Sequence, residues 1–200
     1  MLKRFLFPAV LLVSASAANA TILIDLQSGN PVSDGAGGFN WNYLVSLQPG
    51  AFMTSGDQFA VYDVQGLKGA SFTVDPALTT TDTFNVSTPA TGPKPGFFSP
   101  TDTAVPNVVV TLSGTENISQ GIVNGPALHL GTLTIDSAFG AAASADYGSL
   151  THKVGGLQGP LFSVSSVAAP VPEPSTYGFM GIGLAAIAAL GLRKTRRNRK

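Results

Sequence analysis

The stretch Phe-Asn-Trp-Asn-Tyr-Leu-Val-Ser-Leu, residues 39–47, decides the fold class. Its large apolar side chains alternate with mainly polar ones, so that Phe39, Trp41, Tyr43 and Val45 share one face. Because successive side chains of a β-strand point to opposite faces, this alternation predicts a strand with one buried face. We interpret these aromatic residues as core, since they would bury a large area there. The alternative is that Trp41 and Tyr43 stack on sugar rings.

Short runs of β-branched and aromatic residues, separated by turn residues, occur on both sides of this strand. The run VVVTLS at 108–113 predicts a central, well-buried strand. Residues 87–106 contain five prolines and are expected to form a long surface loop. The pattern predicts one all-β domain, a β-sandwich of jelly-roll or immunoglobulin-like type. Further strands are expected at 21–26, 57–64, 70–74, 81–86, 128–139 (with a bulge at Gly131), 146–154 and 161–167.

The first twenty residues have the pattern of a secretory signal peptide. Lys3 and Arg4 precede an apolar run at 5–13, and Ala18-Asn19-Ala20 supplies the small residues of a cleavage site. We therefore predict that residues 1–20 direct the chain to the general secretory machinery. Signal peptidase would then cut between Ala20 and Thr21, which leaves 21–167 as the exported domain.

The last thirty residues combine a proline-rich linker, an apolar helix and a basic tail. Residues 168–176 are expected to form a stiff linker that contains Pro172, Glu173 and Pro174. Residues 177–192 carry no charge and would span roughly 24 Å as a helix, which makes a minimal transmembrane helix. The basic tail, residues 193–200, would stay on the cytoplasmic side as a stop-transfer signal; its charges are Arg193, Lys194, Arg196, Arg197, Arg199 and Lys200.

This order of parts resembles the PEP-CTERM sorting signal of Gram-negative bacteria, a region also catalogued as an ice-binding protein C-terminal domain. The resemblance covers residues 171–200. It implies recognition by exosortase, a membrane transpeptidase that processes the chain near residues 172–174. It also implies export in bacteria that make exopolysaccharide, often as biofilm material. The alternative is an ordinary C-terminal membrane anchor with a proline-rich hinge.

Charge is distributed unevenly along the chain. Eight of the eleven basic residues lie in the two terminal signals, so the exported part keeps three lysines against ten acidic residues. Its formal net charge of −7 makes nucleic acid and anionic lipid poor partners. The chain has no cysteine, so disulfides and thiol chemistry are excluded.

The sequence predicts neither a catalytic site nor a cofactor or metal. The exported part contains His129 and His152, and neither lies in a recognised catalytic motif. We interpret His129 as a surface or satisfied core histidine. A calcium site remains an alternative without repeat spacing to support it; it would draw on Asp25, Asp57, Asp63, Asp75 and Asp136.

Three segments of the exported part also resemble a recurring type of PEP-CTERM ectodomain. The first carries Asp57, Phe59, Tyr62, Asp63 and Gly66; the others are PTDTAVPNVVVTLSGT, from residue 100, and LGTLTIDSAFG, from residue 130. This resemblance names no activity.

We therefore expect a non-enzymatic protein of the cell surface or extracellular matrix. It would pass through an inner-membrane intermediate with a periplasmic ectodomain, and exopolysaccharide is a candidate partner. The alternative is a secreted polysaccharide-binding module or a polysaccharide-active enzyme.

Overall fold

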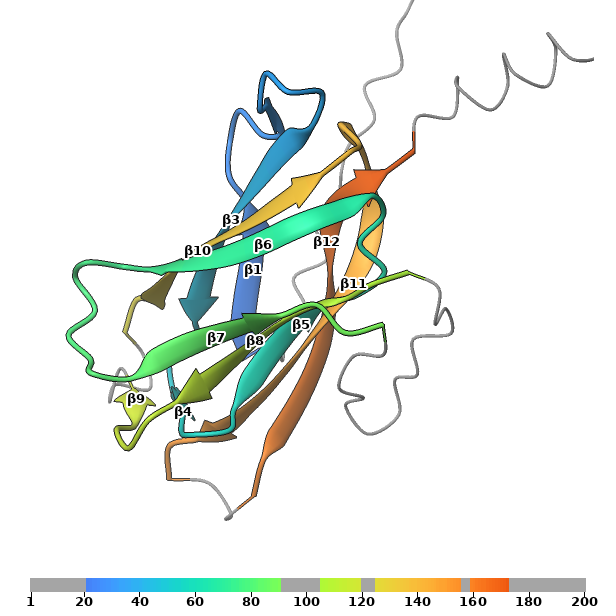
Figure 1. The fold of residues 1–200 in the computed structure, drawn as a ribbon. Coiled ribbons are helices and arrows are strands. Elements are labelled where there is room, and N and C mark those ends of the chain that lie inside the picture. The colour runs from blue at the N-terminus through green and yellow to red at the C-terminus, as the bar shows by residue number, and fades with distance from the viewer. Residues whose placement is uncertain (1–20, 91–104, 120–124, 156–158, 173–200) are drawn as a thin grey trace, which may run out of the picture.

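The computed structural model describes residues 21–90, 105–119, 125–155 and 159–172, and within them the secondary structure is all β. Two antiparallel sheets face each other across one core (Figure 1). The strands are β1 (Ile22–Leu26), β2 (Val32–Ser33), β3 (Phe39–Leu47), β4 (Ala51–Met53), β5 (Gln58–Val61), β6 (Leu67–Val74), β7 (Thr83–Ser87), β8 (Val108–Ser113), β9 (Ile118–Ser119), β10 (Leu128–Ser137), β11 (Ala141–Lys153) and β12 (Leu161–Val171).

The first sheet has the order β1-β3-β10-β6, with β2 beside the start of β3. Its central pair is β3 and β10, in which Trp41 lies opposite Ile135 and Tyr43 opposite Leu133. The register shifts between His129 and Gly131, so the predicted bulge is confirmed. Gly131 is required there because a Cβ would collide with the backbone oxygen of Thr73 on β6.

The second sheet has the order β7-β8-β5-β11, and β12 pairs with β11 along its other side. The β11–β12 hairpin forms the longest ladder, from Ala141 opposite Val171 to Thr151 opposite Leu161. Beyond the hairpin, the end of β11 pairs with β4, which in turn pairs with β9.

The inner faces of both sheets build one hydrophobic core. Trp41, Tyr43 and Val45 of β3 are fully buried, as the alternation predicted, and Phe39 packs against them from the rim. Phe72 of β6 contacts Phe59 of the other sheet at a ring distance of 5.7 Å. Two sheets packed face to face over one core constitute a β-sandwich. Whether its topology is jelly-roll or immunoglobulin-like stays a prediction.

Strand ends differ from the prediction mainly in the second sheet. The strands at 39–47 and 108–113 are confirmed with the predicted bounds. In contrast, β11 begins at Ala141 instead of residue 146, and β12 continues to Val171 instead of ending at 167. The first four residues of the expected linker, 168–171, therefore belong to the sheet.

The two terminal signals lie mostly outside the described residues. This applies to the signal peptide at 1–20, to Glu173 and Pro174, to the helix at 177–192 and to the basic tail at 193–200. Within the described ranges, no helix has the length and apolar character needed to cross a membrane.

Candidate functional site

The segment that resembles the sorting signal begins at the last residue of β12. Pro170 is buried within β12, Val171 pairs with Ala141, and Pro172 follows directly as the strand ends. The Tyr43 hydroxyl, which comes from the first sheet, donates a 2.9 Å hydrogen bond to the carbonyl oxygen of Ala168. Burial raises the pKa of Tyr43, so the phenol remains a donor at neutral pH. The folded domain thus holds the chain firmly up to the start of the Pro-Glu-Pro sequence.

The residue expected at the mature N-terminus is also anchored. The Thr21 hydroxyl lies 2.6 Å from that of Thr151 and 3.2 Å from that of Ser149, both on β11. Its backbone nitrogen donates to the Ser163 hydroxyl on β12, at 3.3 Å. We call Thr21, Ser149, Thr151 and Ser163 the hydroxyl cluster; all four are buried. The residue that follows the predicted cleavage position is therefore bonded to both strands of the hairpin.

Each histidine of the domain is held by a different polar partner. His152 Nδ1 lies 2.9 Å from Asp57 Oδ2, and its ring stacks on Phe52 at 5.2 Å. The same carboxylate oxygen accepts a hydrogen bond from the backbone N–H of Thr54. This pair ties the β4–β5 turn to β11.

His129 is exposed on β10, and its Nδ1 lies 3.0 Å from the hydroxyl oxygen of Ser46. The interpretation of His129 as a surface histidine is confirmed. A nucleophile, a base and an orienting acid would have to share one site for hydrolysis. The described structure places the Ser46–His129 pair on the first sheet and the Asp57–His152 pair on the second.

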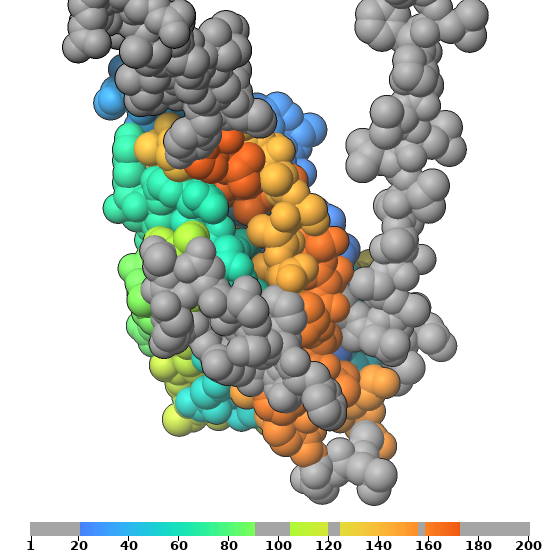
Figure 2. All heavy atoms as spheres, turned by 90° about the vertical axis from the view of Figure 1, so that its right-hand side faces the viewer, coloured from blue at the N-terminus to red at the C-terminus, as the bar shows by residue number. Residues whose placement is uncertain are grey.

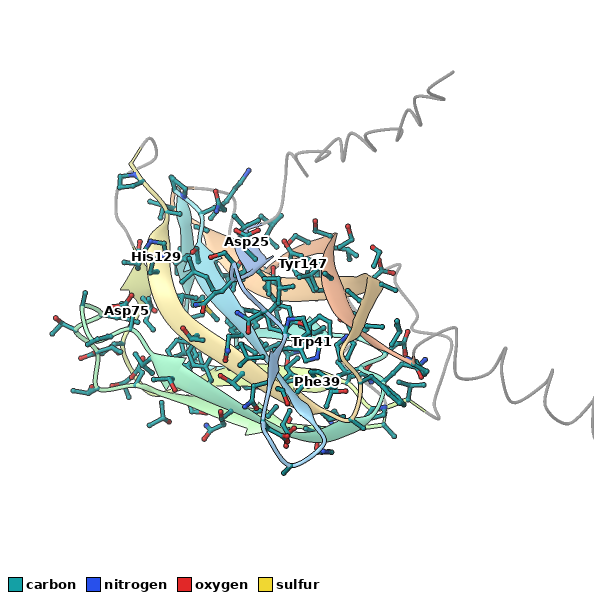
Figure 3. The ribbon with its side chains drawn as sticks, turned by 90° about the horizontal axis from the view of Figure 1, so that it is seen from above. Asp25, Phe39, Trp41, Asp75, His129 and Tyr147 are labelled. Carbon is teal, nitrogen blue, oxygen red and sulfur yellow. The ribbon has the colours of Figure 1, made fainter. Side chains whose placement is uncertain are left out.

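The aromatic pair weighed for sugar stacking lies in the core. Trp41 and Tyr43 are both fully buried, and Figure 3 places Trp41 between the two sheets. The Trp41 Nε1–H donates a 3.0 Å hydrogen bond to the carbonyl oxygen of Phe139. The core interpretation is confirmed, and these rings have no face for a sugar.

The five aspartates considered for calcium do not come together. Asp57 binds His152, and Asp75 caps its own turn by accepting from the backbone N–H of Ala77. Asp25 lies well apart from Asp75 in Figure 3. No group of three or more His, Asp or Glu side chains suited to a metal occurs among the described residues.

The three segments that resemble PEP-CTERM ectodomains meet at one end of the sandwich. Asp63, at a left-handed φ of 52°, donates its backbone N–H to the Asn107 side-chain oxygen, and fully buried Asn107 also donates to the Pro89 carbonyl. The Ser137 hydroxyl donates a 2.7 Å hydrogen bond to the Gln65 carbonyl. At Gly66, with φ 63°, a Cβ would lie 2.7 Å from the Phe139 ring.

These motif residues therefore fix a corner where β5, β6, β8 and β10 end or begin. Sequence reasoning found the residues without assigning them roles. It did not identify Asn107 as a buried residue that holds this corner. The position of Asn107, between Pro106 and the strand β8, was the available signal.

The described chain is thus an all-β domain whose last strand runs into a C-terminal sorting segment. The family described as PEP-CTERM protein-sorting motif matches residues 170–197, and the chain carries this motif. The motif marks an exported protein that is processed at the membrane, with exosortase as the processing partner. The search of curated proteins found no match.

Proposed function

We propose that the chain is a non-enzymatic protein of the cell surface or biofilm matrix of a Gram-negative bacterium. The observation that carries this proposal is the direct continuation of β12 into the sorting motif at 170–197. The protein would enter by the general secretory pathway, pause in the inner membrane with its domain in the periplasm, and be released after cleavage by exosortase. The domain is the part that persists outside the cell, where it associates with exopolysaccharide.

The hydrogen bonds of the domain support a structural role. Both histidines and the buried Asp57 hold neighbouring strands together, and the motif residues at Asp63, Gly66 and Asn107 hold a corner. Side chains of the types used in catalysis are thus employed in fixing the sandwich.

The test is the intact mass of the protein from native cells and from the culture medium, with its C-terminal peptide mapped. A released chain that starts at Thr21 and ends within residues 172–176 is expected. Glu173→Ala should abolish this processing, whereas Pro160→Ala, outside the motif, should leave it unchanged. A chain that still ends at Lys200 in the membrane fraction would contradict the proposal and favour a plain anchor.

A second candidate function, polysaccharide binding, is favoured by the outer face of the first sheet. Asn40 and Asn42 of β3 lie beside Asp136 and Thr134 of β10, all half-buried. The Thr134 hydroxyl donates to the Asn42 side-chain oxygen at 2.8 Å, and one buried carboxylate oxygen of Asp136 has no hydrogen-bond partner in the described structure. Amides, hydroxyls and carboxylates are groups that hydrogen-bond sugar hydroxyls.

A polysaccharide pull-down separates this candidate from the first. Retention that Thr134→Ala reduces, but the matched exposed change Thr83→Ala does not, would support binding by this face. Retention no higher than background would overturn it. Release of soluble sugar would favour the polysaccharide-active enzyme instead.

A further inference from the structure

The outer edge of β12 has backbone groups without partners in the described structure. Strand β12 pairs with β11 alone, and the 2.9 Å bond from Tyr43 to the Ala168 carbonyl shows which residues face the free edge. In an antiparallel strand the N–H and C=O of one residue point to the same side, and successive residues alternate. The even-numbered residues Phe162, Val164, Ser166 and Ala168 therefore direct their backbone groups away from β11.

Two observations agree with this assignment. The Asp146 carbonyl accepts from the Tyr62 N–H, so Asp146 faces β5, and the Ser166 opposite it is left facing outward. Pro170, also even-numbered, has no N–H to offer, and proline is tolerated in a strand where that nitrogen faces a free edge. Among the described contacts, only the Ala168 carbonyl on this edge is occupied.

The free edge is apolar and uncharged. The strand reads LFSVSSVAAPV, without any ionisable side chain, and Phe162 and Val164 are 48% and 42% exposed. The outer strands of the first sheet carry charge, with Asp25 on β1 and Lys68 on β6, whereas β7, at the other edge of the second sheet, is also uncharged but has only five residues. Figure 2 shows β11 and β12 running down the face turned to the viewer. Natural sheets commonly protect long flat edges with charge or bulges, and the eleven-residue ladder of β12 has neither.

We propose that β12 pairs antiparallel with β12 of a second copy of this chain, with Val164 on the two-fold axis. This inference rests on the proposed function as a matrix protein, for which self-association is a direct use. With the axis at Val164, Phe162 lies opposite the second copy's Ser166, and Val164 lies opposite its own counterpart. The next pair would join Ala168, whose carbonyl is occupied, to Pro160, which has no N–H, so the ladder ends there.

A second copy is the occupant that the charges favour. The exported part has a formal net charge of −7, so most surfaces of two copies repel each other. The β12 edge is a neutral, self-complementary strip, as a two-fold interface requires. Only another extended backbone satisfies both the donors and the acceptors of such an edge.

Antiparallel pairing also sets which form of the protein associates. The two strands run in opposite directions, so their C-terminal ends at Pro172 point away from each other. We therefore expect pairing of released chains rather than of two chains held in one membrane by their C-terminal segments.

A single cysteine in this cysteine-free chain tests the register. We would introduce Val164→Cys, with Ser71→Cys on the exposed face of β6 as the matched control, and treat each with a short bifunctional maleimide. The Cα atoms of a hydrogen-bonded antiparallel pair lie about 5.5 Å apart, well within reach of the reagent. Val164→Cys should give a covalent dimer at least about tenfold faster than Ser71→Cys. Equal rates would overturn the proposal.

Sedimentation equilibrium of the form recovered from the medium gives the independent measurement. Val164→Lys should raise the dimer dissociation constant by about tenfold or more, because two like charges would lie directly opposite each other at the axis. A protein that stays monomeric at the highest soluble concentration, or a dimer that Val164→Lys leaves intact, would overturn the proposal. If no form of the protein is released into the medium, the proposed matrix function is contradicted. Sedimentation equilibrium of the full chain in detergent would then still test the pairing of β12 strands.

Discussion

The central strand pair of the first sheet and the β11–β12 hairpin of the second are long antiparallel ladders built from opposite kinds of residue. The β3–β10 pair buries Trp41, Tyr43, Leu133 and Ile135. Half of the hairpin's strand residues are alanine, serine or glycine, and its buried side includes three members of the hydroxyl cluster. Both ladders nevertheless close the same core.

The difference concerns what holds each ladder in place. Apolar area that is removed from water stabilises β3 and β10. In the hairpin, hydrogen bonds with Thr21, which directly precedes β1, and with Tyr43 of β3 help to fix its position. Substitutions should therefore act through cavities in one region and through lost hydrogen bonds in the other.

The largest effect is expected for Trp41→Ala. The ring is fully buried and its N–H binds the Phe139 carbonyl, so truncation leaves both a cavity and an unpaired acceptor. We expect a loss of about 3–5 kcal/mol in the free energy of unfolding, measured by urea denaturation. A loss below about 1 kcal/mol would show that the first sheet does not depend on this packing.

Thr151→Val tests the hairpin in the same assay. The change keeps the shape of a fully buried side chain and removes the hydroxyl 2.6 Å from that of Thr21. The Thr21 hydroxyl keeps the Ser149 hydroxyl, 3.2 Å away, as a partner, so the loss of this one buried hydrogen bond should cost about 1 kcal/mol. Thr73→Val, at an exposed position on β6, is the control and should be neutral. Equal effects of the two changes would remove the distinction between the ladders.

The same contrast explains what the sequence could reveal of the fold. Large apolar side chains at every second position identified 39–47 as a strand, and three consecutive valines identified 108–113 as another. Residues 141–145 read AAASA, which has low β propensity, so the start of β11 was missed. Pro170 and Pro172 suggested a linker, because sequence alone does not show that β12 lies at an edge. The strands β2, β4 and β9 have two or three residues, too few to form a period.

The site shows a similar division. The sorting motif was found because its parts follow one another along the chain. The pairs Ser46–His129 and Asp57–His152 join residues 83 and 95 positions apart, and no local pattern predicts them. Burial of the Tyr43 hydroxyl against β12 likewise depends on how the two sheets face each other.

Alkaline pH should weaken the fold through its buried tyrosines. Burial raises the pKa of Tyr62 to about 12, and it raises the pKa values of Tyr43 and Tyr147 as well. Below about pH 10 both folded and unfolded chains keep these protons, so their contribution to stability is intact. Above it the unfolded chain loses them first, and the free energy of unfolding should fall by up to about 1.4 kcal/mol per pH unit for each tyrosine. Urea denaturation between pH 8 and 12, with Tyr62→Phe expected to reduce the slope, provides the measurement; a flat profile would contradict it.

The smallest effect on stability is expected for Phe162→Ser, at the outer edge of the hairpin. The side chain is 48% exposed and the residue opposite it, Leu150, is half-buried, so little apolar area is lost. We expect a change within about 0.5 kcal/mol, as for most surface positions. Association should respond differently, because a polar residue replaces the apolar side chain that flanks the proposed axis. If Phe162→Ser weakens dimer formation and leaves the urea midpoint unchanged, Phe162 contributes to association and not to the packing of the core. A loss of stability comparable to that of Thr151→Val would instead mean that Phe162 packs within the monomer.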